Sequence, residues 1–472
     1  MLTRTFGLVG LLVLLGLALF NAPHTRAAPH AVFTVTTTND ANDGVCDAAH
    51  CSLREAINAA NSSGAAGVID FNIIGFPPFV IEPGSPLPAV TQNGINIDGY
   101  SQLGAIQNTD PSISNANLMI ELSGAAAGAA SGLELAGGNS SVRGLVIYHW
   151  SGTAVVLTSS FNTVAGNFIG IGTDGVTGLT NLEGVYLGDA TTSNVIGGEI
   201  AAERNVIGYN SFNGVYASGS GHSIVKNLVG VSAGGALAVP NGNGIQLRAN
   251  NVEIRSNVIS GNSGYGVWLD GGARKNTITS NIIGADATLA AALPNSSDGI
   301  LLNNAVKKNR IGGNMITNNG GAGIALTPNA GAGNNLGGNW IFDNTLLGID
   351  LNQDGITPND KFDADGGPNL LQNMPEITSA ESTPQRVRGR IKTASNVTVT
   401  LDFYANNTCD LSGFGEGLFY LGSTTVTTNA KGKAAFNWIA TSPFATGQSI
   451  TATATVKKST SEFSACALAL PG

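Results

Sequence analysis

Apolar and polar positions along the chain recur with a long period. An asparagine is followed by two apolar residues, a second asparagine five positions on, and a glycine nine positions on that opens an apolar-x-apolar strand. This spacing occurs four times, at Asn205/Asn210/Gly214, Asn257/Asn262/Gly266, Asn314/Asn319/Gly323 and Asn339/Asn344/Gly348. Successive strand starts are about 22 to 33 residues apart, a period that predicts a solenoid with one coil per repeat.

The recurring strand predicts what faces inward and outward. Two apolar side chains point into each coil and the residue between them points out. Stacking the coils brings the outward residues into one row, which comprises Glu134, Val156, Tyr186, Tyr216, Gln246, Trp268, Leu301, Ala325 and Asp350. We expect asparagine at the corners because it tolerates left-handed backbone and its stacked amides can form ladders.

Other repeat folds match less well. A leucine-rich repeat needs a leucine framework and a helix in each unit, and a propeller needs about four strands per 40–50 residues. Charged residues make up only 11% of the chain, while glycine reaches 64, which suits many tight turns around a thin core. The pattern therefore predicts an all-β parallel β-helix over residues 69–351.

Both ends of the solenoid carry candidate caps. Val32–Thr38 is typical of a strand, and Ser52 with Glu55 forms a capping box for a helix whose apolar face lies over the first coil. From Pro375 onward asparagine loses its dominance and alternating threonine-rich runs appear, which predict an antiparallel β-sandwich over 377–472. Residues 352–376 form an acidic linker between the two domains.

The N-terminal segment resembles a known family. Cys51-Ser-Leu-Arg-Glu-Ala-Ile57, preceded by Thr34-Val-Thr-Thr-Thr-Asn-Asp40 and Cys46, is similar to the CSLREA domain of secreted bacterial proteins, here spanning residues 28–68. The resemblance implies that a right-handed, pectate-lyase-like β-helix follows. Segments such as Gly415-Glu-Gly likewise resemble a C-terminal sandwich module of such proteins, which implies a second cap or an attachment to the cell surface. Most of these proteins have no established activity, so the resemblance implies fold and export more than function.

The first residues predict export. Arg4 and the apolar run Leu8–Phe20 indicate a signal peptide over residues 1–27, cleaved after Ala27 because the next site would place Pro29 after the cut. An uncleaved anchor is the alternative. No later apolar stretch is suited to crossing a membrane, so we expect a secreted or cell-surface protein.

Net charge and cysteine content limit the classes of partner and the compartment that we expect. The net charge of −9 argues against nucleic acid. Four cysteines fit an oxidising compartment, and the economical pairing is local, Cys46 with Cys51 and Cys409 with Cys466. We do not expect a metal site on these cysteines.

Part of the outward row is a candidate ligand-binding surface. Tyr186, Tyr216 and Trp268, with the amide of Gln246 between the last two, suit the apolar faces and hydroxyls of sugar rings. The alternative is that these aromatic side chains stack on one another and stabilise the sheet.

The acidic linker is a candidate calcium site. A D-x-N-x-D-G start followed by further aspartates supplies the oxygen ligands that Ca²⁺ prefers. The candidate ligands are Asp350, Asn352, Asp354, Asp360, Asp363 and Asp365. Lys361 occupies the position where an EF-hand has its bidentate glutamate, and a solvated linker is the alternative.

Fragments of a hydrolase signature occur without their context. Three motifs of a polygalacturonase-like hydrolase have counterparts here, namely Asn108-Thr-Asp110, Gly221-His222 and Arg390-Ile-Lys392. The Asp-Asp pair of that signature is missing from the sequence, and Arg390 falls in the predicted sandwich. His222 precedes Asn227 by five residues, as the corner asparagines do, so we interpret it as a corner residue. A lyase would also need a cationic base, and the outward row contains none.

These patterns favour a structural, adhesive or polysaccharide-binding role without an assignable catalytic site. The partner would be an extracellular polysaccharide or a cell-envelope component, and calcium is the one cofactor indicated. The alternative is a polysaccharide lyase or glycoside hydrolase that acts along the outer face of the β-helix.

Overall fold

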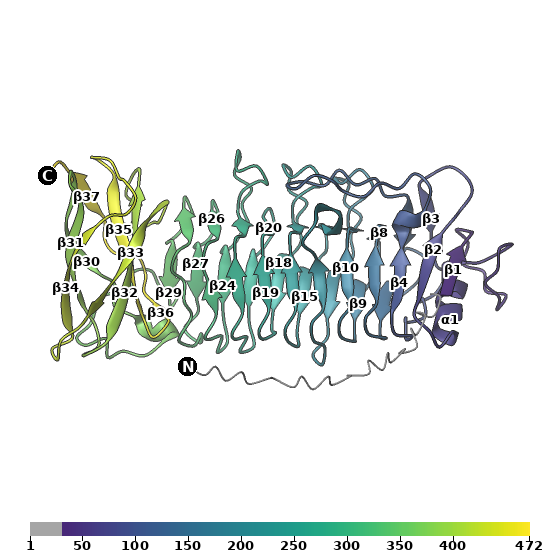
Figure 1. Cartoon of the computed structure of the whole chain (residues 1–472), viewed down its shortest axis with the longest axis horizontal. Helices are drawn as coiled ribbons and strands as arrows, with labels where there is room; N and C mark the ends of the chain where they lie inside the picture. The colour runs from purple at the N-terminus through teal and green to yellow at the C-terminus, as the bar shows by residue number, and fades with distance from the viewer. Residues whose placement is uncertain (1–30) are drawn as a thin grey trace, which may run out of the picture.

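A computed structural model describes residues 31–472, so the predicted signal peptide lies outside the described residues. Three parallel sheets wind into a right-handed β-helix, and a mixed sheet of mostly antiparallel strands follows at the C-terminal end (Figure 1). This confirms the predicted fold class. One α-helix, α1 (Leu53–Ser62), lies at the N-terminal end.

Each sheet of the β-helix is built from short strands of successive coils. Sheet A contains β1 (Ala31–Val35), β2 (Gly67–Phe71), β4 (Ile95–Asp98), β7 (Ser141–Arg143), β10 (Thr163–Ala165), β13 (Val195–Gly197), β16 (Ser223–Val225), β19 (Glu253–Arg255), β22 (Thr277–Thr279) and β25 (Arg310–Ile311). Sheet B contains β3 (Phe79–Ile81), β5 (Ile120–Ser123), β8 (Leu145–Tyr148), β11 (Phe168–Ile169), β14 (Val206–Ile207), β17 (Leu228–Val229), β20 (Val258–Ile259), β23 (Ile282–Ile283), β26 (Met315–Thr317) and β28 (Trp340–Phe342). Sheet C contains β6 (Leu133–Leu135), β9 (Thr153–Leu157), β12 (Glu183–Leu187), β15 (Asn213–Ala217), β18 (Asn243–Leu247), β21 (Val267–Leu269), β24 (Ile300–Leu302), β27 (Ile324–Leu326) and β29 (Ile349–Leu351).

A C-terminal domain follows the β-helix. Its strands are β30 (Glu376–Ser382), β31 (Gln385–Lys392), β32 (Thr398–Asn406), β33 (Phe419–Thr427), β34 (Lys433–Ile439), β35 (Ser449–Val456), β36 (Ser459–Thr460) and β37 (Ala467–Leu470). They enclose a separate core that includes Phe403, which stacks on Trp438 with ring centroids 4.4 Å apart.

Inward aliphatic side chains from all three sheets form one continuous core. It runs from Val35 in β1 to Leu351 in β29. A single coil cannot bury its own apolar face, so each coil depends on its neighbours for burial. Because β1 pairs in parallel with β2, the solenoid starts earlier than the sequence pattern predicts.

Buried asparagines form three hydrogen-bonded ladders along the corners. In each ladder, the side-chain oxygen of an asparagine accepts a hydrogen bond from the asparagine of the preceding coil. The donor is either the side-chain amide or the backbone N–H of that asparagine. The ladder between sheets A and B comprises Asn167, Asn205, Asn227, Asn257, Asn281, Asn314 and Asn339. The ladder between sheets B and C comprises Asn181, Asn210, Asn241, Asn262, Asn295, Asn319 and Asn344. The ladder between sheets C and A is interrupted and comprises Asn162 with Asn194, and Asn276 with Asn309 and Asn334.

The left-handed backbone at these corners belongs to a different residue than expected. Ser256, with φ of 57°, and Ser280, with φ of 57°, each precede a ladder asparagine, and Asn257 itself is not left-handed. The preceding residue makes the turn, which leaves the asparagine side chain pointing inward to bond the neighbouring coils. The asparagine ladders confirm the expected hydrogen bonding, whereas the left-handed turn falls at most corners on the residue before the ladder asparagine and not, as expected, on the asparagine.

Sheet B is covered on its outer side. Three hairpins leave the helix after sheet B and are closed by the bridges Ile171–Gly178, Val231–Ala238 and Ala285–Ala292. They stack on one another, since the N–H of Ala233 donates to the carbonyl of Gly175 at 3.0 Å. A second apolar cluster, which includes Phe168 and Val231, fills the space beneath them.

The two ends of the solenoid are capped as the sequence predicts. At the first coil, α1 buries Leu53, Ala56 and Ile57, and the capping box between Ser52 and Glu55 is present. At the last coil, groups of the C-terminal domain complete the ladders: Asn344 donates to Glu416 at 3.3 Å. The N–H of Leu351, in the last strand of sheet C, donates to Glu462 at 2.9 Å.

Both predicted disulfides are present, Cys46–Cys51 and Cys409–Cys466. Within residues 31–472, none of the helices has the length and apolar character needed to cross a membrane.

Candidate functional site

The predicted outward row forms on sheet C. Consecutive strands pair residue for residue, so Tyr186 lies beside Tyr216, Tyr216 beside Gln246, and Gln246 beside Trp268. The remaining members follow in the same register from Glu134 to Asp350. The four candidate sugar-binding residues therefore occupy four consecutive coils.

The two tyrosines of the row stack on each other. Their ring centroids are 5.3 Å apart and their planes differ by 13°. Rings lying flat on the sheet could not approach so closely, so Tyr186 and Tyr216 stand with their faces toward each other and their edges toward solvent. The alternative interpretation, in which outward aromatics stabilise the sheet by stacking, thus describes this pair.

Gln246 and Trp268 are less exposed than residues of a flat, open binding surface. Gln246 is buried, and its side-chain oxygen accepts from Asn213 at 3.1 Å. Trp268 is half-buried, with Tyr265 tilted against it at a centroid distance of 5.8 Å. Its indole N–H has no hydrogen-bond partner among the described residues.

A second outward row runs beside the first and was missed by the sequence argument. Glu183 and Asn213 come directly before the recurring glycine, and the Asn213 amide donates to Glu183 at 2.9 Å. Asn243, one coil further, donates to Asn213 at 3.1 Å. Burial raises the pKa of Glu183, although the Asn213 amide opposes the rise. The signal was available: a polar residue stands directly before that glycine in successive repeats.

A cation does lie on this face, although outside the row itself. The Arg248 side chain reaches the Tyr216 hydroxyl and lies 3.6 Å from the carboxylate of Asp270. The outer face of sheet C therefore combines aromatic edges, amides, carboxylates and one guanidinium.

The six predicted calcium ligands fall into two groups with different partners. Asp350 is buried, and one of its carboxylate oxygens has no hydrogen-bond partner among the described residues, while Asn352 donates to Asp354 at 2.7 Å. Asp360, Asp363 and Asp365 form the other group, with carboxylate oxygens within 4.8 Å of one another.

Within the second group, Asp363 is the most constrained. It accepts from the Asn373 N–H at 2.6 Å and from the Thr393 hydroxyl at 2.9 Å. Burial, with the neighbouring Asp365 and Asp360 carboxylates, raises the pKa of Asp363 to about 6. A cation among these oxygens would relieve that repulsion.

The fragments of a hydrolase signature have structural roles. His222 is buried in a corner, where it accepts from the Asn194 N–H at 3.1 Å and lies 2.7 Å from the Ser218 carbonyl. Burial lowers its pKa, which favours the neutral ring. Asn108 is buried, and its side-chain amide lies within hydrogen-bond distance of three backbone carbonyl groups. Arg390 forms an ion pair with Glu376 in the C-terminal domain.

Sheet A carries a hollow that the sequence did not indicate. Its volume is about 440 Å³, and its lining includes Asp98, Tyr100, Arg143 and Glu203. Arg143 is paired with Asp98 at 2.6 Å, and the Tyr100 hydroxyl donates to the Gly166 carbonyl at 2.8 Å. Arg143 and Asp98 are thus paired with each other, while Tyr100 and Glu203 are bonded to backbone groups.

Comparison with known proteins supports the fold. Residues 176–360 match the model of the right handed beta helix region. No curated protein matches the sequence.

Among solved structures, the enzymatically active domain of bacteriophage CBA120 tailspike protein 2 is similar, with 9% identity, 89% of this chain and 73% of that chain covered, and a TM-score of 0.39. The A-module of the Azotobacter vinelandii mannuronan C-5 epimerase AlgE6 has 15% identity, 65% and 91% coverage, and a TM-score of 0.36. The tailspike protein of the E. coli bacteriophage HK620, solved with a pentasaccharide, has 11% identity, 89% and 92% coverage, and a TM-score of 0.36.

Proposed function

We propose that this protein is exported and binds an extracellular polysaccharide along the outer face of sheet C, without catalysis. The observation that carries the proposal is the register of Tyr186, Tyr216, Gln246 and Trp268 in consecutive coils. A repeating polymer laid along the solenoid axis would meet a similar set of groups at each coil. The predicted signal peptide, the CSLREA resemblance and two disulfides support export.

The chemistry of this face suits sugars in a specific way. The stacked tyrosines present ring edges and hydroxyls, and Trp268 presents part of an apolar ring. Glu183, Asn213 and Asn243 add a line of hydrogen-bonding groups beside them. Sheet B is covered by hairpins, so its outer face does not offer a comparable surface.

Replacing Trp268 by alanine should weaken binding to the cognate polysaccharide about tenfold, which corresponds to the roughly 1.4 kcal/mol that an aromatic contact can supply. Affinity electrophoresis in gels containing pectin, alginate or cell-envelope polysaccharide measures this. Trp340→Ala is the matched control, because Trp340 is 41% exposed in β28 of sheet B. Equal retardation of both variants, or no binding of the wild-type protein to any polymer, would contradict the proposal.

A polysaccharide lyase or glycoside hydrolase is the second candidate. Arg248 beside Tyr216, and Glu183 with its raised pKa on the same face, are the observations that favour it. Release of unsaturated or reducing ends from pectin or alginate, lost in Arg248→Ala, would establish catalysis. If the polymer binds but is not cleaved, the result would exclude cleavage of that polymer and support binding without catalysis.

Calcium binding at Asp360, Asp363 and Asp365 stays a prediction. Saturating Ca²⁺, at about a hundred times its Kd, should raise the melting temperature by about 3 °C relative to EDTA in a chain of this length. Asp363→Asn should remove that difference, whereas Asp354→Asn, in the other group, should keep it. An identical melting curve of the wild-type protein in Ca²⁺ and EDTA would favour a solvated acidic linker.

A further inference from the structure

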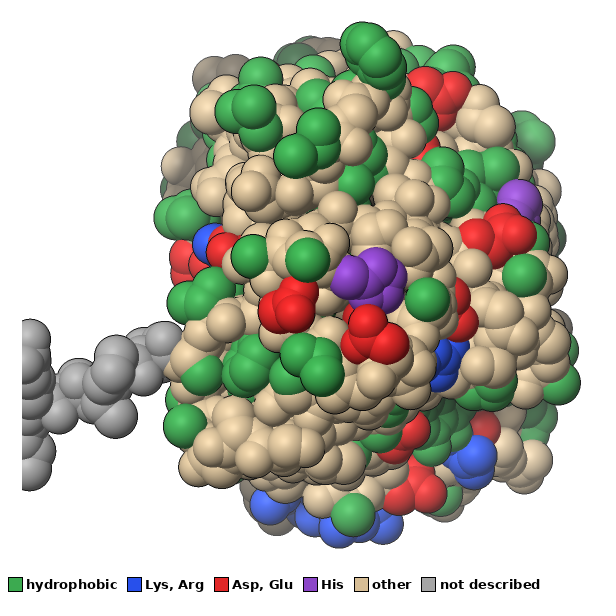
Figure 2. All heavy atoms as spheres, turned by 90° about the vertical axis from the view of Figure 1, so that its right-hand side faces the viewer, with side chains coloured by type: hydrophobic (Ala, Val, Ile, Leu, Met, Phe, Trp, Pro, Cys, Tyr) green, Lys and Arg blue, Asp and Glu red, His purple; other side chains and the backbone are tan. Residues whose placement is uncertain are grey.

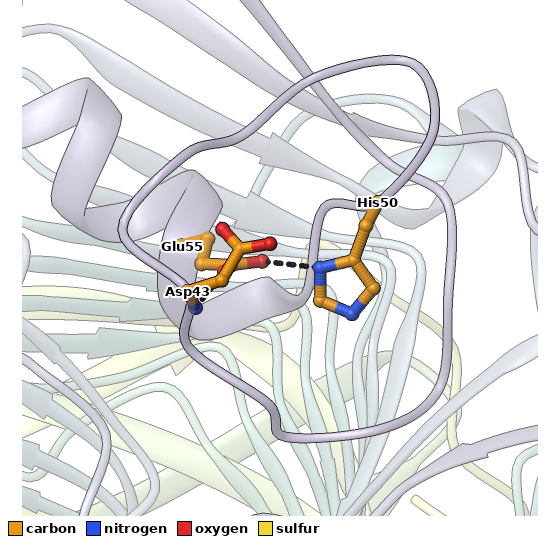
Figure 3. A group of neighbouring side chains, drawn as sticks. All are labelled: Asp43, His50 and Glu55. Carbon is orange, nitrogen blue, oxygen red and sulfur yellow. Dashed lines mark hydrogen bonds and ion pairs between the residues drawn. The ribbon is translucent and has the colours of Figure 1, made fainter.

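Three potential metal-ligating side chains converge at the N-terminal end of the solenoid. The loop between β1 and α1 carries Asp43 and His50, and the first turn of α1 carries Glu55 (Figure 3). One ligand atom from each lies within 4.8 Å of the others. Asp43 is exposed and His50 half-buried, so solvent can reach the group, and histidine and acidic side chains are visible on this end of the molecule (Figure 2). This group lies at the opposite end of the chain from the acidic linker.

The hydrogen bonds around His50 direct one ring nitrogen toward a carboxylate. His50 Nε2 lies 3.1 Å from the side-chain oxygen of Asn39, which can only accept, so Nε2 carries the proton in a neutral ring. Nδ1 then presents a lone pair, and it lies 3.0 Å from Oε2 of Glu55. No donor among the described residues is hydrogen-bonded to Nδ1.

Glu55 is held in place by the backbone. It is buried, its Oε2 accepts from the Ser52 N–H at 2.8 Å, and its Oε1 accepts from the Asp43 N–H at 2.7 Å. A carboxyl group held by two backbone donors therefore faces an imidazole nitrogen that has no hydrogen-bond donor among the described residues, an arrangement that requires a positive charge between or on them.

A divalent metal ion satisfies this requirement. Bonds of about 2.0–2.2 Å from a metal to a histidine nitrogen and a carboxylate oxygen place the two ligand atoms about 3.0–3.4 Å apart at coordination angles of about 90–109°. An imidazole with two carboxylates suits Zn²⁺ and related first-row ions, whereas Ca²⁺ prefers an all-oxygen shell. Asp43 is exposed, which leaves the outer coordination positions to solvent.

We propose that Asp43, His50 and Glu55 bind a divalent transition-metal ion that fastens the loop of residues 39–51 onto α1. The Cys46–Cys51 disulfide already shortens this loop, and the Asp43 N–H already bonds Glu55, so the ligands are held close together before the ion arrives. The ion adds a second fastening at the side chains, over the coil end that α1 covers.

Isothermal titration of the EDTA-treated, tag-free mature protein with ZnCl₂ tests the site. One Zn²⁺ should bind per chain, and both His50→Ala and Asp43→Asn should weaken that binding at least tenfold. His149→Ala is the matched control, because His149 is an exposed histidine in a β-helix corner. Asp363→Asn should also retain binding, which separates this site from the acidic linker, and CaCl₂ should not compete.

Two results would overturn the proposal. Zn²⁺ binding that is equal in wild type, His50→Ala and Asp43→Asn would place the ion elsewhere. Absence of Zn²⁺ binding by the wild-type protein would mean that a proton on His50 provides the charge facing Glu55. Because Asp43 is exposed, its substitution should leave the circular dichroism spectrum unchanged, so a loss of binding in that variant reports on the site and not on folding.

Discussion

Asn257→Ala should lower the free energy of unfolding by about 4 kcal/mol, since it orphans two buried backbone groups at roughly 1–3 kcal/mol each. The Asn257 side chain is buried in the ladder between sheets A and B. Its oxygen accepts from the Asn227 N–H at 2.9 Å, and its amide donates to the Ile224 carbonyl at 2.8 Å and to Asn281 at 3.0 Å. Alanine offers neither a donor nor an acceptor to the neighbouring coils.

Urea unfolding followed by circular dichroism measures this loss. Asn58→Ala is the control, because Asn58 is exposed on α1 and its replacement should change stability by less than about 0.5 kcal/mol. If Asn257→Ala lowered stability by no more than the control does, the ladder would be a by-product of the stacking and not a source of stability.

Stability should decrease as the pH rises from about 4.5 to above 7, because two carboxyl groups are buried where the β-helix meets the C-terminal domain. Burial raises the pKa of Glu416 to about 7 and that of Glu462 to about 7, more than their hydrogen-bond donors lower it. A group that holds its proton more tightly when folded stabilises the fold below its unfolded pKa. That contribution is lost as the pH rises through the folded value.

The size of this effect follows from the shift. A rise in pKa from 4.5 to about 7 corresponds to roughly 3 kcal/mol of unfolding free energy for each carboxyl group. The protein loses this contribution completely only above about pH 8. His222, buried and with a lowered pKa, acts in the opposite direction below pH 6.5. The comparison must therefore be made between wild type and a variant at each pH.

Glu416→Gln is that variant, since glutamine resembles the protonated acid. It should flatten the fall in unfolding free energy between pH 5 and pH 8. Glu199→Gln is the control: pairing with Arg255 lowers the pKa of Glu199, so this group stays ionised throughout the range. A Glu416→Gln protein with the wild-type pH profile would show that this carboxyl group is ionised in the folded state.

The repeat made most of the β-helix predictable. When one residue per strand faces outward and each strand pairs with the next in parallel, the sequence spacing alone places Tyr186 beside Tyr216 and Gln246 beside Trp268. The same spacing identified His222 as a corner residue, as the structure confirms. These features depend on nearest-neighbour stacking, which is repeated in every coil.

Other features depend on contacts that no spacing encodes. The face-to-face contact of Tyr186 and Tyr216 is a matter of side-chain rotamers, and the division of the predicted calcium ligands follows from the turn after Asp350. The hollow on sheet A forms where Tyr100 and Glu203, far apart in the sequence, meet over the same strands. The meeting of Asp43, His50 and Glu55 likewise needs the fold of the β1–α1 loop.

The three hairpins that leave the helix after sheet B bear on how the molecule can be altered. At most corners between sheets A and B the turn is a single residue before a buried asparagine, and the segment before Asn205, which contains the 3-10 helix Ala201–Glu203, is longer while its ladder bonds are kept. The hairpins closed by Ile171–Gly178, Val231–Ala238 and Ala285–Ala292 already carry extra length without disturbing the coils beneath. The flank over sheet B is therefore the place where epitopes or affinity tags can be grafted in parallel rows, leaving the face formed by sheet C unobstructed.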